Sequence, residues 1–198
     1  MPNWCNNLLT LEHPEPKMIT RAVKAFNQGE LLDEFVPIPE ILREDDVDTE
    51  AAVKATGHSS WYDWCIANWG TKWDISPAAN ADLPDDNTAY MTFDTAWAPP
   101  VEVYDELTRL GFTVQGYYYE PGAGFCGLYA DGEDQCFQIP GDSESIREEI
   151  PTDIDDMFGI SESMAEWERE NQDEVTTWYK DGVKETGLEP HPKPLKEI

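Results

Sequence analysis

Basic residues are scarce in this sequence. Its 198 residues include 13 lysines and arginines against 41 aspartates and glutamates, which gives a formal net charge of −28. A surface of this charge repels the phosphates of nucleic acids and of anionic lipids, because proteins bind both through basic residues. We therefore expect no direct nucleic-acid binding and a partner that is itself basic.

Long apolar segments are missing as well. No run of apolar residues approaches the roughly 18 that a membrane-spanning helix requires. The N-terminal residues 1–5 show no basic segment followed by an apolar one, as a signal peptide would. The sequence therefore predicts no membrane contact and a cytoplasmic location.

Cysteine occurs at only four positions. None of them belongs to a C-x-x-C motif or lies at a metal-ligand spacing from a histidine. We therefore expect no metal site and no cofactor. The four positions are Cys5, Cys65, Cys126 and Cys136.

A two-residue turn at Asp131-Gly132 would set the register of one hairpin. In that register Cys126 pairs with Phe137 and Gly127 pairs with Cys136. The two cysteines then point to opposite faces of the sheet, because side chains alternate along a strand. The sequence therefore predicts that they form no disulfide and that all four cysteines are reduced and buried.

Signals for strands and helices alternate along the first two thirds of the chain. Strands are expected where β-prone residues stand between turn residues, and helices where apolar residues recur every three to four positions. The expected strands span 6–13, 88–95, 112–120, 125–130 and 135–139, and the expected helices follow Pro16, Ser60 and Pro100. This order predicts an α+β fold over residues 1–140, a ferredoxin-like antiparallel sheet with helices on one face.

Two segments imitate ligand-binding motifs without completing them. Residues 46–50 hold the first three alternating acids of an EF-hand loop, but Ala51 and Gly57 stand at the positions of its glycine and its bidentate glutamate. Residues 121–127 are rich in glycine, but they join two predicted strands and lack the lysine of a phosphate-binding loop. We therefore predict a solvated acidic loop over 44–50 and a turn at the second segment.

The C-terminal part of the chain is its most acidic part. Residues 131–198 hold 20 of the 41 acids and 6 of the 13 bases. Helices are predicted at 143–158, interrupted by Pro151, and at 161–179. They form an acidic helical extension over 141–185, and a disordered tail follows at 186–198.

Acids recur along neighbouring faces of the second of these helices. Their mutual repulsion weakens a helix, so an uncompensated acidic face fits a partner surface better than an element optimised for folding. The residues that we expect to bind a partner are Glu162, Glu166, Glu170, Asp173 and Glu174.

Tryptophan is concentrated between Trp61 and Asp74, a segment that holds four of the eight tryptophans. Such a cluster lines either a core or a binding surface, which would be a stacking or carbohydrate-type platform. Base stacking is disfavoured, because such platforms lie in basic grooves. Tryptophan is highly buried on average, so we predict residues that join helix to sheet. The tryptophans concerned are Trp4, Trp61, Trp64, Trp73 and Trp97.

Several short segments combine tryptophan, proline and asparagine in a distinctive order. They are Pro2–Asn7, Phe35–Glu40, Trp61–Asp74, Thr95–Pro100 and Tyr119–Gly122. Together they resemble, over roughly the first 140 residues, the YubB-like family of phages and conjugative plasmids, with Ala98 where that pattern has serine. The resemblance implies a ferredoxin-like domain and a protein of a mobile element that acts in the cytoplasm of the host cell. The family has no established catalytic residues, so none is transferred.

One local set of residues has the types of a thiol-based catalytic triad. Cys65 would be the nucleophile, His58 the base and Asp63 the orienting carboxylate. Nothing in the spacing indicates that His58 folds back onto Cys65, and cysteine is often a buried core residue. We therefore expect a structural Cys65 and no enzyme. A small enzyme that uses Cys65 and His58 in a Trp-lined pocket is the alternative.

The acidity of the chain has three explanations: solvation, adaptation to high salt, or imitation of the phosphates of a nucleic acid. Together with a mobile-element origin, the third predicts a non-enzymatic accessory protein that binds a basic host protein or nucleoprotein. Such a protein would inhibit a host defence system such as CRISPR or restriction. A structural accessory protein of the element is a further alternative.

Overall fold

The computed structural model describes residues 3–44, 46–75, 80–171, 177–180 and 183–186. The chain divides into two compact units, Met1–Ile139 and Pro140–Ile198. None of the helices in the described ranges has the length and the apolar character needed to cross a membrane.

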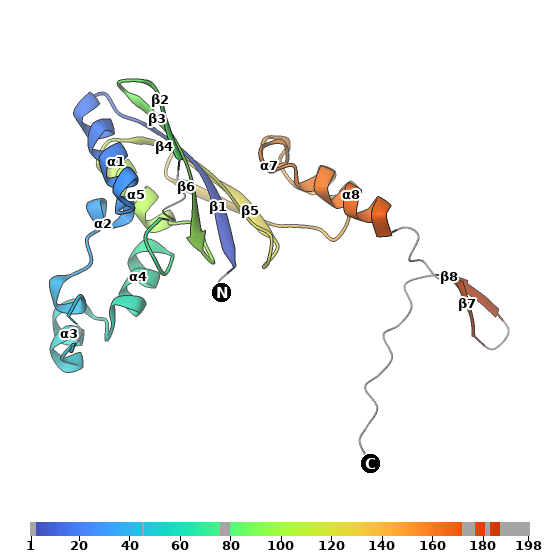
Figure 1. Cartoon of the computed structure of the whole chain (residues 1–198), viewed down its shortest axis with the longest axis horizontal. Helices are drawn as coiled ribbons and strands as arrows, with labels where there is room; N and C mark the ends of the chain where they lie inside the picture. Colours follow the sequence, from blue (N-terminus) through green and yellow to red (C-terminus); the bar gives the residue numbers. More distant parts are fainter. Residues whose placement is uncertain (1–2, 45, 76–79, 172–176, 181–182, 187–198) are drawn as a thin grey trace, which may run out of the picture. The chain divides into compact units, whose positions relative to one another are not determined.

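The first unit is built on a six-stranded antiparallel sheet (Figure 1). Its strands lie in the order β2-β3-β1-β4-β5-β6, so the first strand of the chain is central. Buried and exposed side chains alternate along β1, β3 and β4, as in strands with one face on a core. The bounds are β1 (Trp4–Glu12), β2 (Asn80–Asp85), β3 (Thr88–Ala96), β4 (Thr113–Glu120), β5 (Phe125–Ala130) and β6 (Glu133–Gln138).

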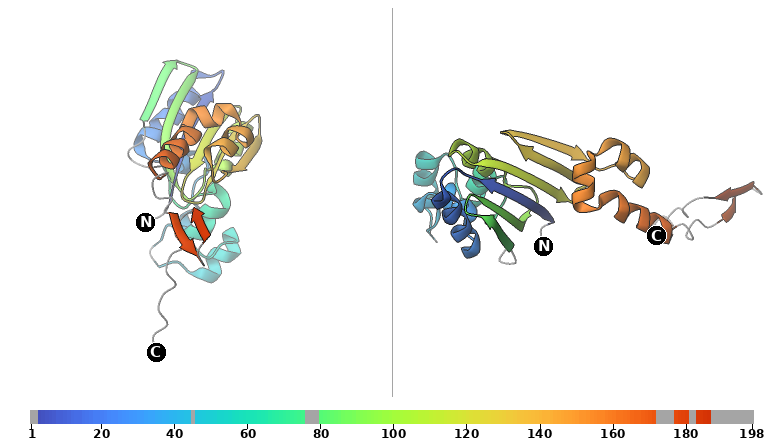
Figure 2. Two further views of the ribbon diagram at one scale, coloured as in Figure 1. Left: turned by 90° about the vertical axis from the view of Figure 1, so that its right-hand side faces the viewer. Right: turned by 90° about the horizontal axis from the view of Figure 1, so that it is seen from above.

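Two amphipathic helices, α1 and α5, lie on the same side of this sheet (Figures 1 and 2). Helix α1 begins with Pro16, whose fixed φ suits the first helical turn, and ends at Gly29 with φ 75°. Helix α5 follows Pro100. The bounds are α1 (Pro16–Gln28), α2 (Leu31–Phe35), η1 (Glu40–Leu42), α3 (Thr49–Thr56), α4 (Trp61–Trp69) and α5 (Val101–Arg109).

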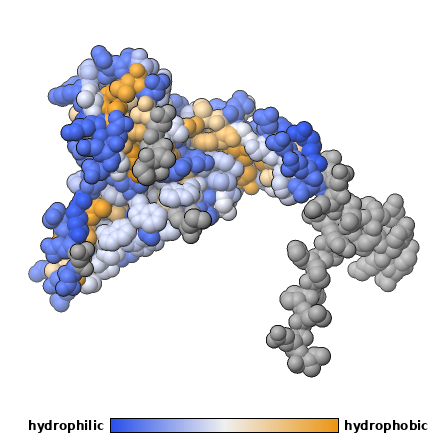
Figure 3. All heavy atoms as spheres, viewed as in Figure 1, coloured by the Kyte–Doolittle hydropathy of each residue, from blue (hydrophilic) through white to orange (hydrophobic). Residues whose placement is uncertain are grey.

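Aromatic side chains of these helices pack against the sheet. Phe26 of α1 packs edge-on against Phe93 of β3, with 5.9 Å between the ring centroids. Tyr104 of α5 packs against Tyr129 of β5 at 5.4 Å, and Gly116 of β4 leaves room for its ring. The outer surfaces of the helices visible in Figure 3 are mostly hydrophilic. The unit is therefore a mixed α+β fold, as predicted.

The hairpin of β5 and β6 has the predicted register. Both residues of the Asp131-Gly132 turn have positive φ, 54° and 80°. Cys126 lies opposite Phe137, and Gly127 opposite Cys136. All four cysteines lie in the described part of the chain, and none forms a disulfide. The prediction of burial is wrong for Cys136, which is exposed, because its face of β6 is open to solvent.

The predicted acidic loop over 44–50 is wrong at its end, because helix α3 begins at Thr49. The Asp48 carboxylate accepts hydrogen bonds from the backbone N–H groups of Glu50 and Ala51, both at 3.1 Å, and so caps α3. Gly57, with φ 81°, ends the helix. One of the acids that imitate a calcium loop is thus a helix cap.

The second unit contains three helices and a hairpin in its described part. Pro151 separates α6 from α7, as predicted. The predicted helix 161–179 is confirmed to Asn171 and is wrong at residues 177–179, because Thr177–Lys180 is a strand; threonine, tryptophan and tyrosine there favour extended backbone. The predicted tail lies outside the described residues after Thr186. The bounds are α6 (Ser143–Glu149), α7 (Thr152–Phe158), α8 (Ile160–Asn171), β7 (Thr177–Lys180) and β8 (Val183–Thr186).

Candidate functional site: an exposed aromatic surface around Lys72

The tryptophans of the first unit divide into a buried and an exposed group. Trp64 and Trp69 are 8% and 2% exposed and belong to the core. The exposed group consists of Trp4 (43%), Trp61 (39%), Trp73 (40%) and Trp97 (39%). The predicted burial of five tryptophans is therefore confirmed for Trp64 and wrong for the other four.

Helix α4 carries members of both groups. The Ser60 side chain accepts a hydrogen bond from the Asp63 backbone at its start, and Gly70 in the left-handed region ends it. Trp64 and Trp69 then face the core, where the Trp69 indole donates to the Val36 carbonyl at 2.8 Å. Trp61 and Tyr62 in the first turn are left exposed. Trp61 therefore lies one turn before the buried Trp64 and outside the core.

Trp97 projects from a strained turn after β3. Its φ is 71°, a conformation that residues with a side chain rarely adopt. Its backbone N–H donates to the Asn3 carbonyl at 3.0 Å, and the Thr95 hydroxyl donates to the Ala98 carbonyl at 2.7 Å. A left-handed backbone costs about 1–2 kcal/mol for such a residue. A bulky, exposed indole held in this way is the kind of outlier that functional sites contain.

The exposed rings form one group, which we call the aromatic surface. Trp4 and Trp73 have ring centroids 6.4 Å apart. Tyr62 bridges the other two rings, at 6.4 Å from Trp97 and 6.1 Å from Trp61, and is nearly perpendicular to both. The aromatic surface therefore joins the start of β1, the first turn of α4 and the two loops that carry Trp73 and Trp97.

Lys72 lies at the centre of the aromatic surface. Its Nζ is 4.3 Å from the centroid of Trp73 and 5.5 Å from the centroids of both Tyr62 and Trp97. Each contact is within the range of a cation–π interaction. The side chain is half-buried, and it takes part in none of the ion pairs of the described residues. Aromatic rings, rather than a carboxylate, hold this ammonium group.

The first unit also has a hollow of about 370 Å³. Two of its lining residues are close in sequence to the aromatic surface. Gly70 stands two residues before Lys72, and Ala98 directly follows Trp97. Further lining residues come from α5 and from the helix-side faces of β4, β5 and β6. Those with polar side chains are Glu102, Tyr118, Asp134, Cys136 and Gln138.

Two carboxylates of the hollow hold their protons more tightly than usual. Burial, and then the charges of Asp105 and Asp134, raise the pKa of Glu102. Burial also raises the pKa of Asp134, although the Tyr118 hydroxyl donates to this carboxylate at 2.8 Å and opposes the shift. Neither acid takes part in an ion pair of the described residues. The hollow therefore favours a positively charged group over a neutral one.

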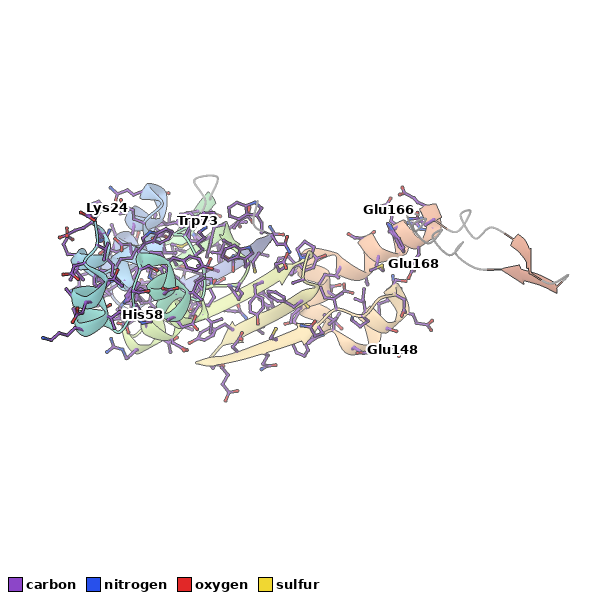
Figure 4. The ribbon with its side chains drawn as sticks, turned by 90° about the horizontal axis from the view of Figure 1, so that it is seen from below. Lys24, His58, Trp73, Glu148, Glu166 and Glu168 are labelled. Carbon is purple, nitrogen blue, oxygen red and sulfur yellow. The ribbon has the colours of Figure 1, made fainter. Side chains whose placement is uncertain are left out.

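The structure confirms the predicted structural Cys65 and gives no support to the alternative, the thiol triad. Cys65 is fully buried in the core, and burial, with the nearby Asp33, raises its pKa to about 12. Asp63 accepts hydrogen bonds from the hydroxyls of Ser59 and Ser60 instead. Figure 4 shows His58 away from Trp73. A thiol in these surroundings is a poor nucleophile, because the thiolate is the reactive form.

The predicted acidic residues lie on and beyond α8. Glu162, Glu166 and Glu170 are exposed on this helix, and Glu166 is labelled in Figure 4. Glu168 has another role, since its carboxylate accepts hydrogen bonds from the N–H (2.8 Å) and the hydroxyl (2.6 Å) of Ser143. Asp173 and Glu174 lie outside the described residues.

Sequence reasoning missed Lys72, Tyr62, Glu102 and Asp134 as site residues. The signal for Asp134 was available, because the predicted hairpin register places it on the same face as Cys136. Nothing in the sequence pattern indicated Lys72, whose surroundings come from three separate segments. Within the described ranges, no group of three or more histidine, cysteine or acidic side chains could hold a metal ion.

No family model matches the chain, and a search of curated proteins found no match. Among solved structures, the chain is similar to protein api92 from Yersinia pseudotuberculosis, a DUF1281 protein. The two are 12% identical, the match covers 71% of this chain and 99% of that one, and the TM-score is 0.43. A likeness at this level carries no argument about fold or function.

Proposed function

We propose that this protein is a non-enzymatic binding protein that recognises a basic partner protein through the aromatic surface. The observation that carries the proposal is the exposure of five large rings in one group, with Trp97 in a strained backbone. Tryptophan and tyrosine dominate the binding energy of protein interfaces, because they bury large areas at low entropic cost. Exposed apolar groups of this kind mark interaction sites.

The charge of the chain supports a basic partner. With a net charge of −28, the protein attracts cationic surfaces and repels anionic ones. The hollow adds the carboxylates of Glu102 and Asp134, neither of which takes part in an ion pair of the described residues. The exposed acids of α8 that were predicted to bind a partner, with Asp173 and Glu174 beyond it, are proposed as a second, electrostatic contact.

The sequence motifs that resemble the YubB-like family support an accessory protein of a phage or plasmid in the host cytoplasm. A host nucleic-acid-binding defence complex, such as a CRISPR or restriction complex, is basic where it binds its nucleic acid. The acidic chain would occupy that groove and inhibit the complex.

The topology supports a ferredoxin-like core for this binding protein. Helix α1 leads from β1 towards β2, α5 leads from β3 to β4, and the strand order is β2-β3-β1-β4. Residues 31–75, between α1 and β2, form an insertion in that core. The insertion supplies Trp61, Tyr62, Lys72 and Trp73, so it builds most of the aromatic surface.

The test is affinity capture with the tagged full chain from phage-infected or plasmid-bearing host cells. We expect a basic partner that wild type and Tyr90→Ala capture equally and that Trp73→Ala and Trp97→Ala lose. Tyr90 is the matched control, because it is an aromatic residue on β3 that is 48% exposed outside the aromatic surface. Equal capture by all four proteins would contradict the proposal.

Competition then tests the inhibitor role. The partner's own nucleic acid is added to the captured complex at low salt. Release of the partner is expected if both occupy one groove, and simultaneous binding without loss of affinity would contradict nucleic-acid mimicry.

A further inference from the structure

We propose that the aromatic surface is a cage for one cationic side chain, a lysine of the partner, and that Lys72 is its resident occupant in the free protein. This inference rests on the proposed function and names the group that the aromatic surface recognises.

The ring geometry favours a compact cation over a flat ligand. A flat ligand that stacks on several rings at once needs rings that share one plane. Here Tyr62 and Trp97 are inclined by 88°. The rings of Tyr62, Trp73 and Trp97 instead surround one point, the Lys72 Nζ, with centroids 4.3–5.5 Å from it. These distances suit an ammonium ion.

Lys72 shows that an ammonium group fits at that point. Its Nζ is within 5.5 Å of three ring centroids, although exposed carboxylates are abundant on this protein. The site is therefore shaped for a positive charge before any partner arrives. Such preorganisation lowers the entropic cost of binding.

The surroundings are complementary to a basic partner rather than to an isolated cation. The lining of the hollow includes Gly70 and Ala98, close to Lys72 and Trp97 in the chain, and the acids Glu102 and Asp134, which suit a second positive group. A partner segment with two basic side chains would place one in the cage and the other in the hollow. The acidic field of the chain draws such a segment in.

Occupancy by the partner requires an exchange. Lys72 stands in the loop between Gly70 and Asp74, and its flexible four-carbon stem allows the ammonium to swing into solvent. As a tethered occupant it competes at a high effective concentration. The cage of the wild type should therefore bind a free cation weakly, and removal of the Lys72 charge should open it.

The test uses the full chain and a defined probe, N-acetyl-trimethyllysine amide. Its control is the uncharged isostere, in which a carbon atom replaces the quaternary nitrogen. Binding is measured by NMR from the indole N–H signals. We expect Lys72→Met to bind the cation at least about tenfold more tightly than wild type does, and at least about tenfold more tightly than it binds the isostere.

Two further variants test whether the probe binds in the cage. Addition of Trp73→Ala to Lys72→Met should abolish binding, whereas addition of Tyr90→Ala should leave it unchanged. Unfolding midpoints equal to that of Lys72→Met show that both are folded. Equal binding of cation and isostere, or no binding to Lys72→Met, would overturn the cage.

The outcomes separate this inference from the proposed function. If the probe fails but Trp73→Ala loses the partner, the aromatic surface binds protein and the cage is wrong. If the probe binds as expected but every aromatic variant captures the partner, the cage is real and the proposed function is wrong.

Discussion

Trp97 combines an exposed indole with a backbone conformation that disfavours any side chain. The exposed indole contributes little to the stability of the fold. The positive φ of the turn is unfavourable for a residue with a side chain. The conformation persists because backbone and hydroxyl hydrogen bonds to Asn3 and Ala98 determine it. Stability therefore does not explain why a tryptophan stands there, which is why we propose that the indole contacts a partner.

The strain at Trp97 can be measured with two substitutions that both remove the indole. Trp97→Gly should be more stable than Trp97→Ala by about 1 kcal/mol, because glycine adopts positive φ without a steric cost. Chemical denaturation of the two variants checks this difference. A lower stability of the glycine variant would show that the turn relaxes when the ring is removed.

Asp74 is a half-buried carboxylate next to Trp73 in the chain. It accepts hydrogen bonds from the backbone N–H groups of Leu32, Asp33 and Ile75, at 3.0, 2.8 and 2.8 Å. Burial outweighs these bonds and raises its pKa to about 6. The folded chain thus holds this proton more tightly than the unfolded chain, where the pKa is about 4.

A raised carboxyl pKa makes stability fall as pH rises. The stabilisation from protonated Asp74 is present below about pH 4 and is lost as the pH rises to about 6. Relative to Asp74→Asn, the free energy of unfolding of the wild type should therefore decrease across this window. Denaturation curves at several pH values give the difference, and an increase would mean that the hydrogen bonds dominate.

The exposed tryptophans could not be predicted from the sequence. Trp61 and Trp64 stand three residues apart in α4, so helical periodicity places them on one side and does not show that the first turn is left uncovered. Trp73 and Trp97 lie in loops that have no periodicity at all. Burial statistics favoured a core for all of them, and the structure leaves Trp61, Trp73 and Trp97 exposed.

At the scale of elements, local chemistry predicted much of the structure. The Asp131-Gly132 turn fixed the register of β5 and β6, and the caps at Ser60 and Gly70 bounded α4. Helix α3 was missed because its acids were interpreted as a loop. The strand Thr177–Lys180 was missed because helical spacing of apolar residues was given more weight than β-propensity.

Gly127 tests the packing of the β5–β6 hairpin. A Cβ atom at this position would overlap the Tyr118 hydroxyl and the Gln135 carbonyl. Gly127→Ala should therefore lower the free energy of unfolding by about 1–3 kcal/mol, the usual cost of overpacking. Gly141→Ala is the control, because an added Cβ there meets nothing within 4 Å. Equal stabilities of the two variants would show that the hairpin shifts freely.

At the scale of the whole molecule, charge governs how fast a partner arrives. Replacement of Glu162, Glu166 and Glu170 by lysine should slow association with the captured partner and flatten its dependence on salt, because steering by exposed charges is screened by ions. Surface plasmon resonance at two salt concentrations measures both. Unfolding of the first unit should not change.

A matched variant separates the position of these charges from the net charge. Asp82, Asp86 and Glu133 are exposed acids of the first unit, and their reversal to lysine changes the total charge by the same amount. If both triple variants slow association equally, steering depends on total charge, and α8 is not a specific contact.

The two edge strands of the described sheet bear on aggregation. An exposed strand edge can pair with a strand of another molecule, and repeated pairing leads to fibrils. Strand β2 contains Pro84, which lacks an N–H donor, and its register shifts between Asp82 and Asp85. Strand β6 begins with Glu133 and Asp134, whose charges repel an identical edge. Both edge strands of the described sheet therefore carry features that oppose polymerisation by strand addition.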